Sequence, residues 1–165
     1  MKRVLLLAAV LALLALPVGG ISLAGYVRGV ASDLSITSLV LLVSLAVAFA
    51  GGPRLQDRRE TRTLAAFVLP GALFLYPMAL GLTAFDPYAL GYPGRVQGLV
   101  FGLAPVALLG SLRGSLLVPL SVGLALAAFR LQILDSRNLW DYLFDPWLVL
   151  YLAGFTIFAR SSKSR

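Results

Sequence analysis

Six runs of sequence without a single charged residue dominate this chain of 165 residues. A helix needs about 20 residues, within a range of about 17–25, to cross the hydrocarbon core of a bilayer. The first three runs exceed this length, the next two lie near its lower limit, and the last reaches it only when it starts near residue 142. The pattern predicts an all-α, polytopic integral membrane helix bundle. We expect a single domain of residues 1–165, with about six transmembrane helices at about residues 4–27, 34–53, 63–85, 96–112, 114–129 and 142–159.

The composition is typical of a membrane protein and excludes several kinds of functional site. Hydrophobic residues make up 59% of the chain and charged residues 13%, whereas soluble domains are about half apolar and about a quarter charged. The chain has no cysteine and no histidine, which excludes disulfides, haem ligation, zinc sites built from these residues, and Ser-His-Asp catalysis. We therefore expect no cofactor and no resident metal, assign no catalytic residue, and favour a protein that is not an enzyme.

The distribution of charge predicts the orientation. If the N-terminus is cytoplasmic, ten of the 14 basic residues lie in cytoplasmic segments, and only Arg28, Arg95, Arg130 and Arg137 lie outside. The positive-inside rule requires such a bias, so the net charge of +7 belongs to the loops and does not indicate nucleic-acid binding. Twelve of the bases are arginine, which favours a GC-rich bacterial genome. We expect a bacterial inner (plasma) membrane protein with both termini cytoplasmic.

The first span has an alternative interpretation as a secretory signal. Lys2 and Arg3 precede an apolar stretch that ends at Leu16, and Ser22-Leu23-Ala24 fits a cleavage pattern. Cleavage would leave five spans. We expect the segment to be retained as an anchor.

Residues 96–129 also allow several interpretations, because Arg113 interrupts them. One continuous helix would be about 51 Å long at 1.5 Å per residue, which is too long for the bilayer. Two helices joined by a tight turn near residues 111–115 fit better, since two glycines flank this point. A re-entrant pair, or Arg113 as a buried functional charge, is the alternative.

Small residues mark one face of the predicted fourth span. Glycines at four-residue steps let two helix backbones approach closely, as in the GxxxG pattern. The partner helix can belong to this chain or to another protein, and the sequence favours packing within the chain. The glycines of this helix-packing face are Gly94, Gly98, Gly102, Gly110 and Gly114.

The predicted outer surface carries the candidate ligand or partner site. The pattern Phe-Asp-Pro-aromatic occurs at residues 85–88 and 144–147, where Asp is expected to cap a helix or turn that Pro begins. Residues 135–145 place apolar side chains at three- and four-residue steps, which predicts a short interfacial amphipathic helix. Carboxylates, guanidinium groups and aromatic rings together would suit a sugar, a lipid headgroup, a peptide or a hard cation. The candidate residues are Asp86, Tyr88, Arg95, Arg137, Trp140, Asp141 and Asp145.

Three classes of function fit these features. The leading hypothesis is a non-catalytic subunit or scaffold of a bacterial inner-membrane assembly, which binds a larger membrane protein through the glycine-rich face and the outer aromatic-acidic surface. The alternative is a small transporter component or lipid-handling protein with a cavity open to the outer face and a lipid or small-molecule ligand. The third is an enzyme that acts on a lipid-linked substrate through Asp86, Asp141 or Asp145. No charged residue falls within the six charge-free runs, and the predicted spans add only Asp145, near the start of the last, which counts against a proton-driven pump.

Overall fold

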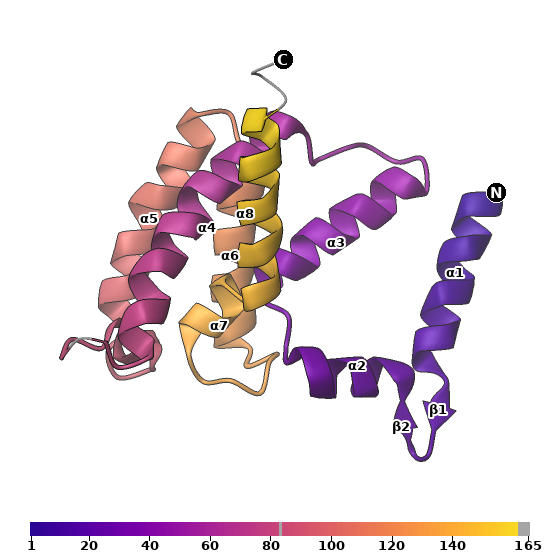
Figure 1. Cartoon of the computed structure of the whole chain (residues 1–165), viewed down its shortest axis with the longest axis horizontal. Coiled ribbons are helices and arrows are strands. Elements are labelled where there is room, and N and C mark those ends of the chain that lie inside the picture. The colour runs from indigo at the N-terminus through magenta and orange to yellow at the C-terminus, as the bar shows by residue number, and fades with distance from the viewer. Residues whose placement is uncertain (83, 162–165) are drawn as a thin grey trace.

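The computed structural model describes residues 1–82 and 84–161, and this part of the chain is built almost entirely of helices (Figure 1). Two strands of two residues each are the only extended pairing in it. The predicted all-α class is therefore confirmed. Two of the predicted cytoplasmic bases, Lys163 and Arg165, lie outside the described residues.

The N-terminal segment corrects the prediction of one continuous span over residues 4–27. It contains α1 (Lys2–Ala15), β1 (Pro17–Val18), β2 (Ile21–Ser22) and α2 (Leu23–Ala31). Pro17 has no backbone N–H to continue a helix, and Gly19 and Gly20 turn the chain with φ angles of 61° and 88°. The Ser22 hydroxyl then caps the first turn of α2. No residue of α1 is buried, and this helix stands beside the rest of the molecule in Figure 1.

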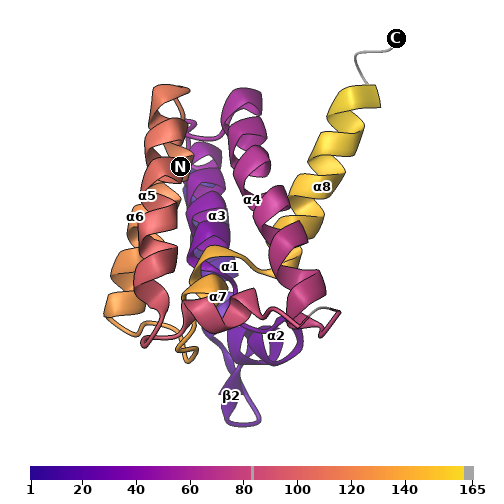
Figure 2. The same cartoon turned by 90° about the vertical axis from the view of Figure 1, so that its left-hand side faces the viewer.

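Five longer helices form the bundle (Figures 1 and 2). They are α3 (Ile36–Phe49), α4 (Arg58–Ala79), α5 (Val96–Leu112), α6 (Leu117–Arg130) and α8 (Pro146–Ser161). Helix α6 contacts α3, α4 and α5, and α8 packs along α4. Serine and aspartate start two of the helices: the side chains of Ser35 and Asp57 accept hydrogen bonds from backbone N–H groups three residues later.

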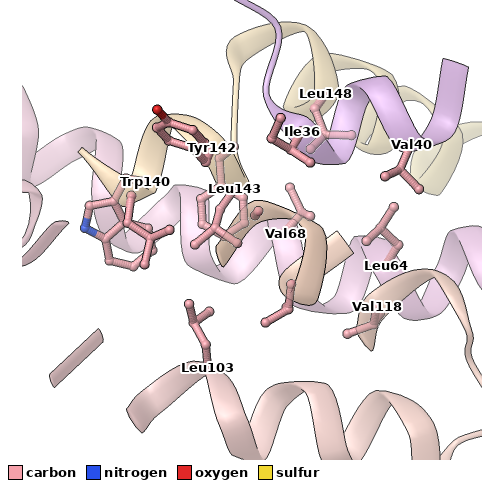
Figure 3. Close-up of a cluster of buried hydrophobic side chains, with 14 of the residues drawn as sticks. Ile36, Val40, Leu64, Val68, Leu103, Val118, Trp140, Tyr142, Leu143 and Leu148 are labelled. Atoms are coloured by element: carbon pink, nitrogen blue, oxygen red, sulfur yellow. The ribbon is translucent and has the colours of Figure 1, made fainter. Parts of the chain in front are cut away.

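The core of the bundle is aliphatic (Figure 3). Leu64 and Val68 of α4, Leu117 of α6 and Leu152 of α8 are all 0% exposed. Leu103 of α5 faces them in Figure 3 and is 3% exposed. These side chains hold four helices together through close packing.

The two ends of the bundle differ in charge: bases concentrate at one end, whereas the other end holds five of the seven acidic residues together with Arg28, Arg95, Arg130 and Arg137. We call one the basic end, which holds the loop before α4 and the turn between α5 and α6 (Figure 1). Its bases include Arg54, Arg58, Arg59, Arg62 and Arg113. We call the other the acidic end, which holds the β-hairpin, a 3-10 helix η1 (Pro87–Gly91) and a short helix α7 (Leu139–Leu143). Its acids are Asp33, Asp86, Asp135, Asp141 and Asp145.

The segment predicted as an interfacial helix is shorter than expected and lies inside the bundle. Only α7 is helical within residues 135–145, because Asn138 caps its start and Phe144 is already extended. Its apolar side chains do not lie on the surface: Leu139 and Leu143 are 0% exposed and Trp140 is 7% exposed. Figure 3 shows Trp140 and Leu143 pointing into the core. The three- and four-residue spacing therefore marks a helix that closes the acidic end of the bundle.

Among the described helices, α4 alone is long and apolar enough to cross a bilayer by length and composition. It has 22 residues, whereas α3 and α6 have 14 each and α5 has 17. The chain at residues 96–130 consists of two antiparallel helices, α5 and α6, with Gly114 in the turn at a φ of 68°. The fold is thus an all-helical bundle whose longest member lies near its centre.

Candidate functional site

Four side chains link the segment before α5 to the segment before α8. We call Tyr88, Asn138, Trp140 and Asp141 the acidic-end cluster. The Tyr88 hydroxyl donates to the Asp141 carboxylate at 2.8 Å, and the Asn138 side-chain amide donates to the Tyr88 carbonyl at 2.8 Å. The Trp140 indole N–H donates to the Pro87 carbonyl at 2.9 Å. The cluster therefore fastens η1 to α7, although about 50 residues separate them in sequence.

Gly91 makes this close approach of η1 and α7 sterically feasible. A Cβ atom at this position would lie 1.7 Å from the Asn138 Oδ1 atom and 2.8 Å from the Trp140 ring. Asn138 is 1% exposed, and its Oδ1 atom also accepts from the Trp140 backbone N–H at 3.0 Å. Only glycine leaves room for this side chain, so Gly91 belongs to the structural core of the cluster.

The environment of Tyr88 holds its hydroxyl in the neutral form. Burial raises the pKa of Tyr88 above its ordinary value of 10.0, and the hydrogen bond to Asp141 raises it further because ionised tyrosine would repel the carboxylate. The same carboxylate also accepts from the Ser136 hydroxyl at 2.5 Å. Tyr88 is thus a fixed hydrogen-bond donor and not a base.

Asp145 lies apart from the acidic-end cluster and connects different helices. It is 4% exposed, and one of its carboxylate oxygens accepts from the Ser35 N–H at 3.0 Å and the Ser35 hydroxyl at 2.6 Å. The Ser38 hydroxyl donates to the same oxygen, and the Leu148 N–H donates to the other at 2.9 Å. This single carboxylate therefore caps α8, as its place before a proline predicts, and binds the start of α3.

The structure brings only some of the predicted site residues together. Tyr88, Trp140 and Asp141 share one cluster, whereas Asp145 faces α3 on the other side of α7. Asp86, Arg95 and Arg137 are exposed. The Asp86 carboxylate accepts from the Tyr88 N–H at 2.9 Å and so starts η1, and Arg95 precedes the first turn of α5.

The predicted glycine face divides into two halves. A Cβ at Gly110 would lie 2.7 Å from the Val118 Cβ, so this glycine packs against α6 within the chain. Gly114 serves the turn at a positive φ. Gly94, Gly98 and Gly102 have nothing within 4 Å of an added Cβ and are exposed. The half of the face nearest the acidic end is therefore open.

A groove that the sequence did not predict runs along α3, α8 and the start of α4. Its volume is about 1070 Å³, and its lining extends from Leu34 and Trp147 near the acidic end to Arg54 and Arg58 at the basic end. Leucine and aromatic side chains make up half of its lining residues. The basic segment at residues 53–62 was a signal for it, but topology alone explained these charges, and only folding places them beside an apolar wall.

Glu60 is a second residue whose role the sequence did not reveal. From the first turn of α4, its carboxylate accepts from the Ser115 hydroxyl at 2.5 Å, the Leu116 N–H at 2.8 Å and the Leu117 N–H at 3.2 Å. These N–H groups open α6, which has no side-chain cap from its own N-cap residue. Glu60 therefore joins α4 to α6 at the basic end.

The hydrogen bonds of these sites hold elements of the fold together. In the described part of the chain, no group of three or more acidic residues is placed to hold a metal ion, and the carboxylates of Asp141 and Asp145 are occupied by donors of the chain itself. No protein family model, curated protein or solved structure matches this chain.

Proposed function

We propose that this protein is a multi-pass protein of the bacterial inner membrane, with both termini cytoplasmic. The exposed surface of the bundle supports this placement, because Leu73, Phe101 and Phe158 are 76%, 78% and 76% exposed. Soluble monomers rarely expose large apolar patches of this kind. Helices of 14 residues, about 21 Å long, are shorter than the hydrocarbon core of about 30 Å, a mismatch that local thinning of the bilayer accommodates.

The orientation can be tested by chemical labelling, since the chain has no cysteine of its own. Ala84→Cys reports on the acidic end and Arg113→Cys on the basic end, and both positions are exposed. In intact cells with a permeabilised outer membrane, a membrane-impermeant maleimide is expected to label the first variant only. Arg113→Cys is expected to react after the inner membrane is opened. Equal labelling of both in intact cells, or recovery of the protein in the soluble fraction, would contradict the proposal.

Within that membrane we infer a non-catalytic subunit that binds a larger protein through the open half of the glycine face on α5. The single observation that carries this inference is the open space over Gly98 and Gly102. Two small residues one turn apart on an exposed helix give a partner helix a close approach to the backbone. Gly94 and Arg95 lie in the turn just before this helix, toward the acidic end where the exposed Asp86 lies, so the predicted aromatic-acidic surface would continue the contact.

A pull-down from the native membrane tests the partner surface. The tagged protein is purified in a mild detergent and the proteins bound to it are identified by mass spectrometry. A stoichiometric partner is expected with the wild type and is expected to be lost in Gly98→Leu/Gly102→Leu. Gly123→Leu is the matched control, because Gly123 is also an exposed helical glycine with open space around its Cβ position.

Each outcome of the pull-down decides the inference. Loss in the double variant but not in the control supports a docking face on α5. Retention of the partner in Gly98→Leu/Gly102→Leu, or purification of the wild type without a stoichiometric partner, overturns it. Because none of these glycines touches another side chain within 4 Å, the variants are expected to fold, and thermal unfolding confirms this.

A further inference from the structure

We propose that the groove between α3, α8 and the start of α4 binds one anionic phospholipid of the inner leaflet. The phosphate would lie against Arg54 and Arg58, and an acyl chain would follow the apolar wall toward the acidic end. This inference rests on the proposed membrane placement. It adds a ligand of stated chemistry and a second surface, on the side of the bundle formed by α3 and α8.

The charges around the groove are complementary to an anionic headgroup. Arg3, Arg54 and Arg58 all line it near its basic end, and no salt bridge involves them within the described residues. Asp57, the one acidic residue in the lining, already accepts from the Glu60 N–H at 2.7 Å as the cap of α4. Guanidinium groups bind phosphate through paired, charge-assisted hydrogen bonds, so a cation-rich rim of this kind favours a phosphate group.

The walls below this rim suit a hydrocarbon chain. The groove is lined by Leu41 and Leu45 of α3 and by Leu148 and Phe155 of α8. Its volume of about 1070 Å³ is at the upper limit of about 1,000 Å³ for small-molecule sites. One leaflet is about 15 Å deep, half of the hydrocarbon core, and α3 with 14 residues is about 21 Å long. An acyl chain whose phosphate lies against Arg54 and Arg58 therefore stays within the length of the groove.

A buried hydroxyl gives an independent indication that the groove is incomplete. Ser44 lines it from α3 and is 2% exposed. In the described part of the chain, its Oγ atom is one of four buried side-chain groups without a hydrogen-bond partner, and the other three, in Thr37, Tyr76 and Ser121, do not line the groove. Buried polar groups are nearly always paired, and Ser38, on the same wall, donates to Asp145. The unpaired hydroxyl is thus a group that the folded chain alone does not satisfy.

The test is native mass spectrometry of the full-length protein in detergent, titrated with dioleoyl phosphatidylglycerol and, separately, with dioleoyl phosphatidylcholine. Two variants probe the groove: Arg54→Gln/Arg58→Gln removes the proposed phosphate contacts, and Ala48→Trp fills the space along α3. Their controls are Arg62→Gln/Arg113→Gln, which removes the same charge from exposed positions of the basic end outside the groove, and Val47→Trp, on an exposed position of α3 that does not line the groove.

We expect one phosphatidylglycerol to bind at least tenfold more tightly than phosphatidylcholine. Arg54→Gln/Arg58→Gln is expected to weaken phosphatidylglycerol binding about tenfold or more, since each base near an anionic lipid contributes measurably. Ala48→Trp should weaken both lipids, and neither control should weaken either.

Equal binding of the two lipids, or equal losses in the controls and the groove variants, overturns the lipid site. The labelling of Ala84→Cys and Arg113→Cys separates the two proposals. Correct labelling without lipid selectivity refutes the site alone, whereas reversed labelling refutes the membrane orientation and the site together.

Discussion

The acidic end and the groove both bring charged and polar side chains to an apolar bundle, but they differ in where the hydrogen bonds go. At the acidic end, Tyr88, Asn138, Asp141 and Asp145 all bind other groups of the chain. Around the groove, Arg54 and Arg58 form no ion pair within the described residues, and Ser44 is unpaired. Polar groups satisfied internally hold elements together, whereas exposed guanidinium groups that no carboxylate of the folded chain pairs are available to an anionic ligand.

The largest predicted effect concerns Asp145. Asp145→Ala leaves the buried donors of Ser35 and Ser38 without an acceptor, and each unsatisfied group costs about 1–3 kcal/mol. We expect the free energy of unfolding to fall by about 3 kcal/mol or more, measured by denaturant titration in detergent. Asp135→Ala, at an 88% exposed side chain, is the control and should change stability little. A mild effect of Asp145→Ala would show that the acidic end is not the structural region.

Gly91→Ala tests whether η1 and α7 must touch. The added methyl group would overlap the Asn138 amide, whose Oδ1 atom lies 1.7 Å from the new Cβ position. Overpacking of this kind costs about 1–3 kcal/mol, so thermal unfolding should move to lower temperature. Gly94→Ala, three residues away with open space around it, should unfold like the wild type. Equal effects of the two substitutions would show that the contact between η1 and α7 does not require glycine at position 91.

Glu60→Gln probes the polar link between α4 and α6 at the basic end. The neutral amide keeps the size of the side chain but loses the charge that favours the N-terminus of α6. We expect a loss of about 1–2 kcal/mol in the free energy of unfolding. The exposed Arg62 lies on the same helix, and Arg62→Gln is the matched control. No loss in Glu60→Gln would mean that water caps α6 equally well.

The raised pKa of Tyr88 predicts that the stability of the folded protein falls at alkaline pH. Its pKa is raised in the folded protein from 10.0, so its contribution to stability is complete below about pH 10 and is lost as the pH rises above that value. Tyr88→Phe removes the hydrogen bond to Asp141, at a cost of about 1 kcal/mol near neutral pH. It should also flatten the fall in stability above about pH 10, measured by unfolding at a series of pH values. An unchanged alkaline profile would contradict the assignment.

The smallest effects compare two serines on one wall of the groove. Ser38→Ala removes a hydrogen bond to Asp145 and should cost about 1 kcal/mol. Ser44→Ala removes an unpaired hydroxyl, so the lipid-free protein should keep its stability or gain slightly. A clear loss for Ser44→Ala in the lipid-free protein would show that the hydroxyl has a partner within the chain.

The sequence predicted the helical class because charge-free runs and proline and glycine breaks are local signals. Its capping motif also placed Asp145 before α8, since Asp-Pro at a helix start needs only neighbouring residues. The division of residues 4–27 was missed because apolar composition outweighed the breaks at Pro17, Gly19 and Gly20. The burial of α7 was missed because an amphipathic spacing does not say whether its apolar face meets lipid or protein.

The candidate site was harder to predict than the fold. The sequence grouped Asp86, Asp141 and Asp145 in one candidate site, yet hydrogen bonds give them three separate roles. Glu60 and the groove both depend on contacts between segments more than 50 residues apart. Such pairings have no local signature, because they arise only when α3, α4, α6 and α8 pack.

The most direct test of the distinction between structural and ligand-binding regions is one pull-down that quantifies both proteins and lipids. It compares the wild type, Gly98→Leu/Gly102→Leu and Arg54→Gln/Arg58→Gln, all purified from native membranes in the same mild detergent. We predict that the first double variant loses the protein partner and keeps anionic phospholipid, and that the second loses the lipid and keeps the partner. Loss of both in either variant, or of neither in both, would contradict the assignment of two independent binding surfaces.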